Sequence, residues 1–261
     1  MVPDDRLDKV PSHFSLVGGV AVISIPLELE GQKKAIGEAI ISGHKNVKTV
    51  LRKISKLEGE RRTASFEFIA GGGTVTCHRE FGFSYRLDVA RVFFNPRLGS
   101  ERMRVASKVR PGERAIVPFA GVGPFAIPIA AAGAQVLALE ISPEACRWLS
   151  ENARHNRVGE MADIVNCDAF AVCGLLKENG LKTKFDRAVV PTPYGRDDAL
   201  DSISPIVKPG GAIHFYTFKK RRQIEDLIRE FEERGFEVEF HRRCGNVAPG
   251  VGRWVFDLVK F

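Results

Sequence analysis

The end of the chain, "FEVEFHRRCGNVAPGVGRWVFDLVKF" from Phe236 to Phe261, decides the fold. It contains two strand-like segments, "FEVEFHRRC" and "RWVFDLVKF", with no helix between them. Two strands joined by a short connection pair antiparallel, because a parallel pair needs a crossover of a dozen or more residues. We therefore expect an antiparallel hairpin at the edge of the sheet that the preceding residues form.

Upstream of this hairpin, from about Pro111, strand-like and helix-like segments alternate. The expected strands are 114–120, 135–141, 162–170, 186–193 and 211–218, and the expected helices are 124–133, 142–156 and 221–235. Ser142 is suited to cap the second helix, with Pro143 in its first turn. Repeated strand–helix–strand units produce a parallel sheet. A final antiparallel strand is typical of the α/β, Rossmann-like fold of class I S-adenosylmethionine-dependent methyltransferases. A dinucleotide-binding fold would continue with strand and helix.

The first hundred residues have a different pattern. Segments 14–26, 47–54, 65–80 and 83–94 are strand-like, with a glycine turn at 71–73, and 29–43 is helix-like. We therefore predict a small α+β domain over residues 1–94, which faces the substrate or RNA. The class I methyltransferase domain is expected over residues 95–261, beginning with a connecting loop and helix, "NPRLGSERMRVASKVRPG".

The composition is that of a globular protein, with 261 residues, 44% of them hydrophobic and 27% charged. The longest apolar stretch, "FAGVGPFAIPIAAAG", is interrupted by Gly and Pro and is shorter than the roughly 20 residues of a membrane span. The amino terminus, "MVPDDRLDKV", has no apolar signal core. Five scattered cysteines form no CxxC pair and no cluster with the six histidines. We expect a cytoplasmic monomer with reduced, mostly buried thiols, no membrane contact and no metal.

The formal net charge of +7 favours an anionic partner. Three segments concentrate the positive charge: "HKNVKTVLRKISK" at 44–56, "KKRRQ" at 219–223 and "HRR" at 241–243. Any one of them is compatible with an ordinary solvated face. Together they indicate RNA or another phosphate-rich substrate.

The segment "FAGVGPF" places Gly121 and Gly123 where the first strand of the larger domain turns into its helix. Glycine permits positive φ and lets backbone N–H groups approach a ligand. Glu140 ends the next strand, where an acid accepts hydrogen bonds from ribose hydroxyls, although a solvated strand-end glutamate has the same pattern. NAD and S-adenosylmethionine both satisfy these features. The late hairpin, and Ala126 in place of a third glycine, favour S-adenosylmethionine. Asp168 is placed to reach an adenine amino group or to cap a helix.

Several blocks carry a family resemblance: "RLDVARVFFNPRLGSER", "PFAGVGPFAIPIA", "HKNVKTVLRK" and "EGERR". They resemble the archaeal and eukaryotic tRNA (guanine-37, N1)-methyltransferases, and also their sister enzymes, the aminocarboxypropyl transferases of wybutosine synthesis. The likeness extends from about Gly18 to the end. It implies a tRNA substrate, S-adenosylmethionine as methyl donor, and attack by N1 of the guanine 3′ of the anticodon.

The resemblance also implies roles for particular residues. Guanine N1 carries a proton at neutral pH, so a base must remove it while negative charge moves onto O6. Glu101 matches the family's general base and Arg62 matches the arginine that holds O6. Phe93 stands where the family has tyrosine, and it is suited to stack on the base or to lie in the core. The implied cofactor contacts are Arg102, Phe119, Gly121, Gly123, Glu140, Ile141, Asp168, Ala169 and Pro191. Without the resemblance, Glu101 and Arg102 would be interpreted as a charged helix start on the surface.

Two departures from the family pattern stand out. Val117 and Pro118 replace a usual aspartate before the glycine loop. "PTP", at 191–193, replaces the usual Asn-Leu-Pro, so Pro191 offers only its carbonyl oxygen. Pro193 and Tyr194 are expected to form a wall beside the target base. The alternative is a strand that ends in prolines to prevent edge pairing.

These features lead to a ranked set of hypotheses. The first is a tRNA (guanine37-N1)-methyltransferase with Glu101 as base. The sister aminocarboxypropyl transfer remains open, because the likeness begins with the family's middle domain and "APGV" at 248–251 resembles those enzymes. Loss of the two polar contacts is also consistent with a catalytically silent tRNA-binding protein. A methyltransferase acting on a small molecule or a protein is a further alternative.

Overall fold

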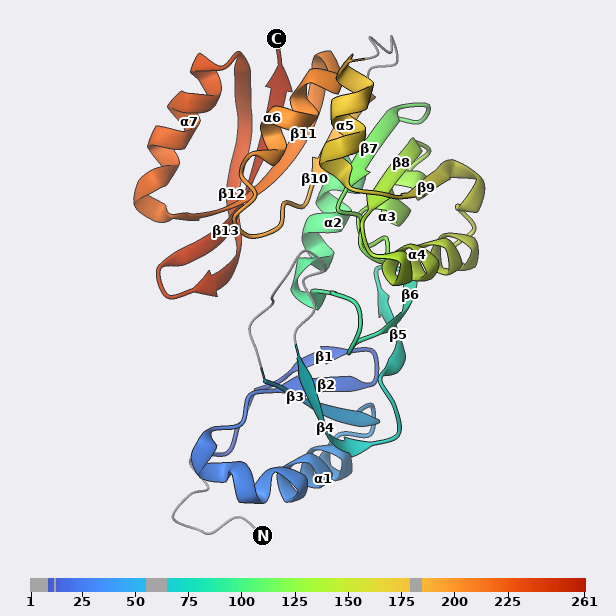
Figure 1. The fold of residues 1–261 in the computed structure, drawn as a ribbon, viewed down its shortest axis with the longest axis vertical. Coiled ribbons are helices and arrows are strands. Elements are labelled where there is room, and N and C mark those ends of the chain that lie inside the picture. Colours follow the sequence, from blue (N-terminus) through green and yellow to red (C-terminus); the bar gives the residue numbers. More distant parts are fainter. Residues whose placement is uncertain (1–8, 12, 55–64, 179–184) are drawn as a thin grey trace. The chain divides into compact units, whose positions relative to one another are not determined.

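The computed structural model describes residues 9–11, 13–54, 65–178 and 185–261, and the chain divides into two compact units, Met1–Pro96 and Arg97–Phe261 (Figure 1). Each unit is described by itself.

The first unit contains a four-stranded sheet with one helix packed on it. In sheet order its strands are β1 (Ser15–Val17), β2 (Val20–Ile23), β3 (Thr49–Lys53) and β4 (Phe66–Gly71), and the helix is α1 (Lys33–Gly43). Strands β2 and β3 are parallel, and the other two pairs are antiparallel. Ile36 and Ile40 of α1 are buried against this sheet. Residue 37, which lies between them, is glycine because a Cβ there would stand 2.6 Å from Ile69 of β4.

A separate antiparallel hairpin, β5 (Val75–Glu80) with β6 (Phe83–Asp88), completes the first unit. The backbone N–H groups of Gly18 and Gly19 donate to His78 and Thr76 of β5. The strand predicted over 83–94 ends at Asp88, whose side-chain and backbone oxygens accept hydrogen bonds from the next N–H groups and turn the chain.

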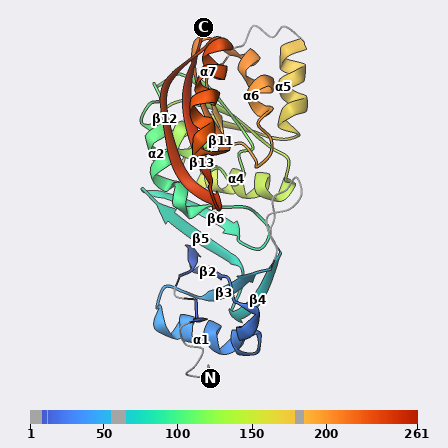
Figure 2. The same cartoon turned by 90° about the vertical axis from the view of Figure 1, so that its left-hand side faces the viewer.

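The second unit is built on a seven-stranded sheet of order β12-β13-β11-β10-β7-β8-β9. Its strands are β7 (Arg114–Pro118), β8 (Gln135–Glu140), β9 (Ala162–Asn166), β10 (Phe185–Val190), β11 (Val207–Lys220), β12 (Phe236–Ala248) and β13 (Val251–Lys260). Strands β7, β8, β9, β10 and β11 pair parallel with one another, whereas β13 lies between β11 and β12 and pairs antiparallel with both (Figure 2). This arrangement confirms the α/β methyltransferase fold with its late hairpin.

Helices cover both faces of this sheet. They are α2 (Gly99–Ala106), α3 (Ala126–Ala131), α4 (Pro143–His155), α5 (Ala169–Glu178), α6 (Ala199–Ile203) and α7 (Ile224–Glu233). Neighbouring residues of β11 identify the two faces: Phe215 contacts Phe231 of α7, whereas Tyr216 donates to Glu101 of α2. Side chains alternate along a strand, so α2 and α7 lie on opposite faces. Helix α4 begins as predicted, because Ser142 Oγ accepts a hydrogen bond from the N–H of Ala145.

Two local predictions differ from the structure. The strand expected over 211–218 begins earlier, at Val207, and residues 208–211 form a bulge inside β11. Phe185 pairs with Val207 there, while Arg187 pairs with Ala212. The cysteines are free, but only Cys173 is buried, and Cys77 is exposed. None of the described helices has the length and apolar character needed to cross a membrane.

Candidate active site

The glycine loop between β7 and α3 has the backbone conformation that a close ligand approach requires. Phe119, Gly121 and Gly123 have φ of +56°, +57° and +95°. Residues other than glycine rarely adopt these positive values, because their Cβ clashes with the backbone. A Cβ at Gly123 would stand 2.3 Å from Leu149, so this glycine is needed for packing. A Cβ at Gly121 would meet nothing within 4 Å. The loop is therefore open on the side of Gly121, where a ligand can contact the backbone.

Glu140, at the end of β8, holds this loop. Its Oε2 accepts a hydrogen bond from the N–H of Gly121 and its Oε1 accepts one from the N–H of Ser142, both at 2.8 Å. Each carboxylate oxygen has a further lone pair, so a ribose diol can still donate to it. Asn166 Nδ2 donates to the carbonyl oxygens of Glu140 and Ile141, at 2.9 and 3.0 Å, which fixes the strand end. Asn166 was not recognised from the sequence.

Asp168 follows β9 and has the capping role that the sequence left open. Its Oδ1 accepts a hydrogen bond from the N–H of Phe170 at 2.9 Å, in the first turn of α5. The Phe170 ring lies 5.5 Å from that of Phe119, and the Arg196 guanidinium lies 3.8 Å above it. The exposed carboxylate thus stands beside an aromatic surface suited to a purine.

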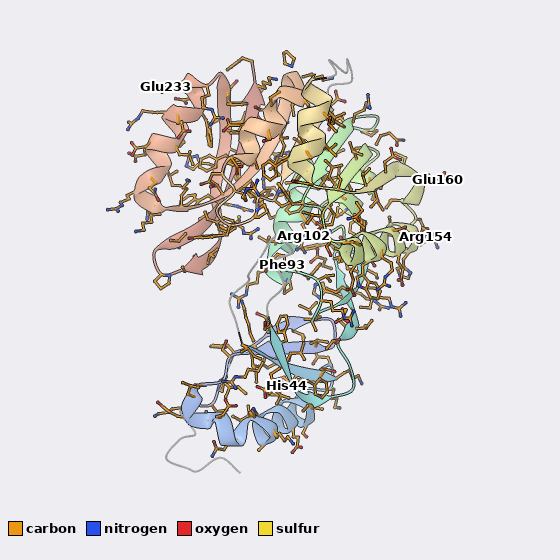
Figure 3. The ribbon with its side chains drawn as sticks, in the orientation of Figure 1. His44, Phe93, Arg102, Arg154, Glu160 and Glu233 are labelled. Carbon is orange, nitrogen blue, oxygen red and sulfur yellow. The ribbon has the colours of Figure 1, made fainter. Side chains whose placement is uncertain are left out.

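Glu101, on α2, is a buried carboxylate with only 3% of its surface exposed. Its Oε1 accepts hydrogen bonds from Arg104 at 2.6 and 2.9 Å and from the Tyr216 hydroxyl at 2.9 Å. Its Oε2 accepts one from Arg242 at 2.5 Å. Arg102 is also buried, so the interpretation of these residues as a surface helix start is wrong (Figure 3).

The surroundings of Glu101 determine its protonation. Burial alone would raise its pKa, but Arg104, Arg242 and Tyr216 outweigh burial, and the pKa lies below the ordinary 4.5. The group is therefore ionised at neutral pH. Oε1 is saturated by its donors, whereas the only partner of Oε2 among the described residues is the half-exposed Arg242. Oε2 therefore retains a lone pair for a further donor.

A network of polar contacts around the buried Asp257 holds Arg104 against Glu101. Arg104 also donates to Asp257 of β13, at 2.6 and 3.0 Å, and Lys108 donates to the same carboxylate at 2.7 Å. The Nδ1 atom of His214 lies 2.6 Å from Asp257, and its Nε2 lies 2.7 Å from Arg187. These residues were missed, although an acid and a histidine inside apolar strands are a recognisable signal.

The neighbouring charges determine the protonation states of Asp257 and His214. Burial opposes ionisation of Asp257, but hydrogen bonds from His214, Arg104 and Lys108 hold its pKa well below the usual range. Burial lowers the pKa of His214, and the neighbouring Arg187 lowers it further despite the attraction of Asp257. A neutral ring that donates from Nδ1 and accepts at Nε2 satisfies both partners.

The segment after β10 forms a fixed loop at the same end of the sheet. The N–H of Thr192 donates to the carbonyl of Val190 at 2.8 Å, and Thr192 is fully buried. Tyr194 is 60% exposed, and its ring lies 5.2 Å from that of Phe218. Strand β10 is paired on both sides, with β7 and β11. It is not an edge strand, so the interpretation of the prolines as edge protection is wrong.

The second unit thus brings most of the expected site residues to one region. The carboxyl ends of its parallel strands meet at one edge of the sheet, where the loops after β7, β8, β9 and β10 lie. The ring of Phe125, which follows the glycine loop, lies 5.3 Å from that of Tyr216 and 6.0 Å from the Arg102 guanidinium. Phe93 is a half-buried residue of the first unit, and Arg62 lies outside the described residues.

Comparison with known proteins gives two family matches. Residues 76–241 match the TRM5/TYW2 methyltransferase domain, and residues 1–74 match the TYW2 N-terminal domain. The chain is 40% identical to tRNA (guanine(37)-N(1))-methyltransferase Trm5b of Pyrococcus abyssi, over 95% of this chain and 74% of that protein. It is 31% identical to the tRNA(Phe) (4-demethylwyosine(37)-C(7)) aminocarboxypropyltransferase of Pyrococcus horikoshii, over 100% of this chain and 93% of that one. A solved complex of aTrm5 with tRNALeu is similar over 99% of this chain and 75% of that chain, with 29% identity and a TM-score of 0.86.

Proposed function

The chain belongs to the TRM5/TYW2 methyltransferase family, and on this premise we propose that it is a tRNA (guanine37-N1)-methyltransferase that uses S-adenosylmethionine. The observation that carries the proposal is the buried, ionised Glu101, with one oxygen available for a proton, on the sheet face that also holds Tyr216. Methylation at guanine N1 requires a base in its unprotonated form, because the N1 proton must leave as the methyl group arrives, and an ionised carboxylate is such a base.

The residues at the carboxyl ends of β7, β8 and β9 fit S-adenosylmethionine, which supplies an electrophilic methyl group when bound. The open side of Gly121 and the free lone pairs of Glu140 suit the backbone and ribose contacts. Asp168 would accept from the adenine amino group beside the Phe119–Phe170 surface. The other residues proposed to hold the cofactor are Arg102, Gly123, Ile141, Ala169 and Pro191.

The remaining residues have proposed roles toward the target base. Glu101 Oε2 takes the N1 proton, and Arg62 stabilises the negative charge on O6. Pro193 and the exposed Tyr194 wall the base, and Phe93 stacks on it. Val117 is fully buried in β7, so the aspartate contact of the family pattern is absent at this position.

The proposal is tested by incubating the protein with an unmodified tRNA transcript and S-adenosylmethionine labelled on its methyl group. Mass spectrometry of the nucleosides should detect 1-methylguanosine. A transcript with adenosine at position 37 is the matched control and should remain unlabelled. No methylated guanosine in a protein that binds both ligands would contradict the proposal.

Two observations favour a second candidate, aminocarboxypropyl transfer. Residues 1–74 match the TYW2 N-terminal domain, and a relative with this activity is similar over the whole chain. Donor labelled on the aminobutyrate chain, offered with tRNA that carries the tricyclic guanine derivative, distinguishes the two reactions. Transfer of the chain label alone would establish this candidate in place of methylation.

A monomeric state and a cytoplasmic location complete the proposal. Sedimentation velocity of the purified chain should give a single species of 28.8 kDa. Fractionation of cells should recover the protein in the cytosolic fraction.

A further inference from the structure

Arg253 on β13 is a buried cation with no counter-charge among the residues that the structure describes. Only 6% of the residue is exposed. Its cross-strand neighbours are Phe218 on β11 and Gly245 on β12, and its guanidinium lies 4.7 Å from the centre of the Phe218 ring. Its side chain forms no hydrogen bond or ion pair with any residue that the structure describes.

Arg187, in the same unit, is a buried arginine whose charge is paired, and it serves as a comparison for Arg253. It is also 6% exposed, but it forms an ion pair with Glu113 at 2.7 Å and donates to the carbonyl of Lys108. For Arg253, burial lowers the pKa, yet an arginine remains protonated at physiological pH. Burial of an unpaired charge is unfavourable, and a single cation–π contact offsets only part of that cost. Arg253 therefore reduces stability unless a ligand supplies the missing anion.

The position of Arg253 indicates which ligand that is. Phe218 lies two residues after Tyr216 on the same face of β11, about 7 Å along the strand from the tyrosine that donates to Glu101, and Arg253 is its partner on β13. The exposed Tyr194 packs on the same Phe218 ring. Strands β10 and β11 separate β13 from β7, which places β13 about 14 Å from the strand of the glycine loop. Arg253 is thus on the sheet face that holds Glu101 and Tyr216, three strands from β7, and the like charge of Arg102 adds to its need for an anion.

We propose that Arg253 binds a phosphodiester oxygen of the substrate RNA beside the target nucleotide. This inference rests on the proposed function, since it takes RNA as the substrate. A guanidinium presents two parallel N–H donors that match two oxygens of one phosphate. Lys220, two residues after Phe218 on the same face of β11, is exposed and can continue the contact with the RNA backbone.

The test compares Arg253→Met with wild type in three measurements. They are the affinity for unmodified tRNA as a function of salt, the affinity for S-adenosylhomocysteine, and the Tm. Arg229→Met is the matched control, because it removes an exposed positive charge on α7. We expect Arg253→Met to weaken tRNA binding about tenfold or more and to reduce the salt slope by about one. Its affinity for S-adenosylhomocysteine should be unchanged, and its Tm should rise by about 2–4 °C.

Each other outcome overturns the inference. Wild-type tRNA affinity and salt slope would show that Arg253 contacts no phosphate. Weaker binding of S-adenosylhomocysteine, with unchanged binding of methylthioadenosine, which lacks the carboxylate, would assign Arg253 to the cofactor. If Arg253→Met does not fold, Arg253→Gln provides a second neutral side chain for the same measurements. A wild-type protein that binds no tRNA would refute the proposed function itself, so the two failures are distinguishable.

Discussion

Glu101 is a carboxylate whose two oxygens have different surroundings, and this difference leads to a test of its role. In Glu101→Gln, the amide oxygen can still accept from Arg104 and Tyr216, but no proton can be taken up. We expect kcat to fall by about 10²- to 10⁴-fold, the contribution typical of a general base. Calorimetry should give the wild-type affinity for S-adenosylmethionine. A nearly normal rate would remove Glu101 from the base role.

Arg242 provides a second test at the scale of a single residue. It lowers the pKa of Glu101 through the hydrogen bond to Oε2, so Arg242→Gln should raise that pKa. A base works in its ionised form, and activity is lost as pH falls through its pKa. The acid limb of the kcat/KM profile should therefore move to higher pH. The neighbouring, exposed Arg243 is the control, and Arg243→Gln should leave this limb in place. An acid limb shared by all three proteins would contradict the assignment.

At the scale of elements, β11 and β13 hold the site together through polar residues that face α2. Asp257→Asn would leave Arg104, Lys108 and His214 without their common anion. We expect a loss of about 3–5 kcal/mol in the free energy of unfolding, as for other broken buried ion networks. Urea denaturation measures this loss. Asp226→Asn removes an exposed partner on α7 and should change stability by less than about 0.5 kcal/mol.

The same two strands show what the sequence could and could not predict. The antiparallel pairing of β13 with β12 could be predicted because no helix separates the two segments between 236 and 261, and this is visible in the local sequence. The contact between Arg104 and Asp257 joins residues 153 positions apart, and no local pattern determines such a pair. The bulge at 208–211 was missed because a Pro-Gly-Gly segment has the composition of a turn whether or not pairing resumes after it. Glu101 was found only through a family resemblance, since its burial depends on this tertiary packing.

At the scale of the whole molecule, these buried groups determine how stability depends on pH. His214 has a lowered pKa when folded, so the unfolded chain takes up a proton below about 6.5 that the folded chain does not. Asp257 and Glu101 also have lowered pKa values, and they contribute stability that is lost as pH falls below their ordinary values of 3.8 and 4.5.

We therefore expect urea midpoints to fall in two stages, first below about pH 6.5 and then below about pH 4.5. His214→Asn should remove the first stage, because asparagine can donate to Asp257 but does not titrate. Midpoints that rise as the pH falls from 7 to 5 would show that the buried histidine is protonated.

The net charge of +7 determines how strongly RNA binding depends on salt, and no single residue supplies this property. Exposed basic residues such as Arg221, Arg222 and Arg243 can release counterions from RNA when they contact phosphates. The affinity for tRNA should therefore fall by about tenfold or more between 50 and 200 mM salt. Binding of S-adenosylmethionine, which lacks phosphate, should change little over the same range. Filter binding and calorimetry measure the two affinities. Equal salt dependence would show that the basic segments are solvated faces, and that the site takes a substrate other than RNA.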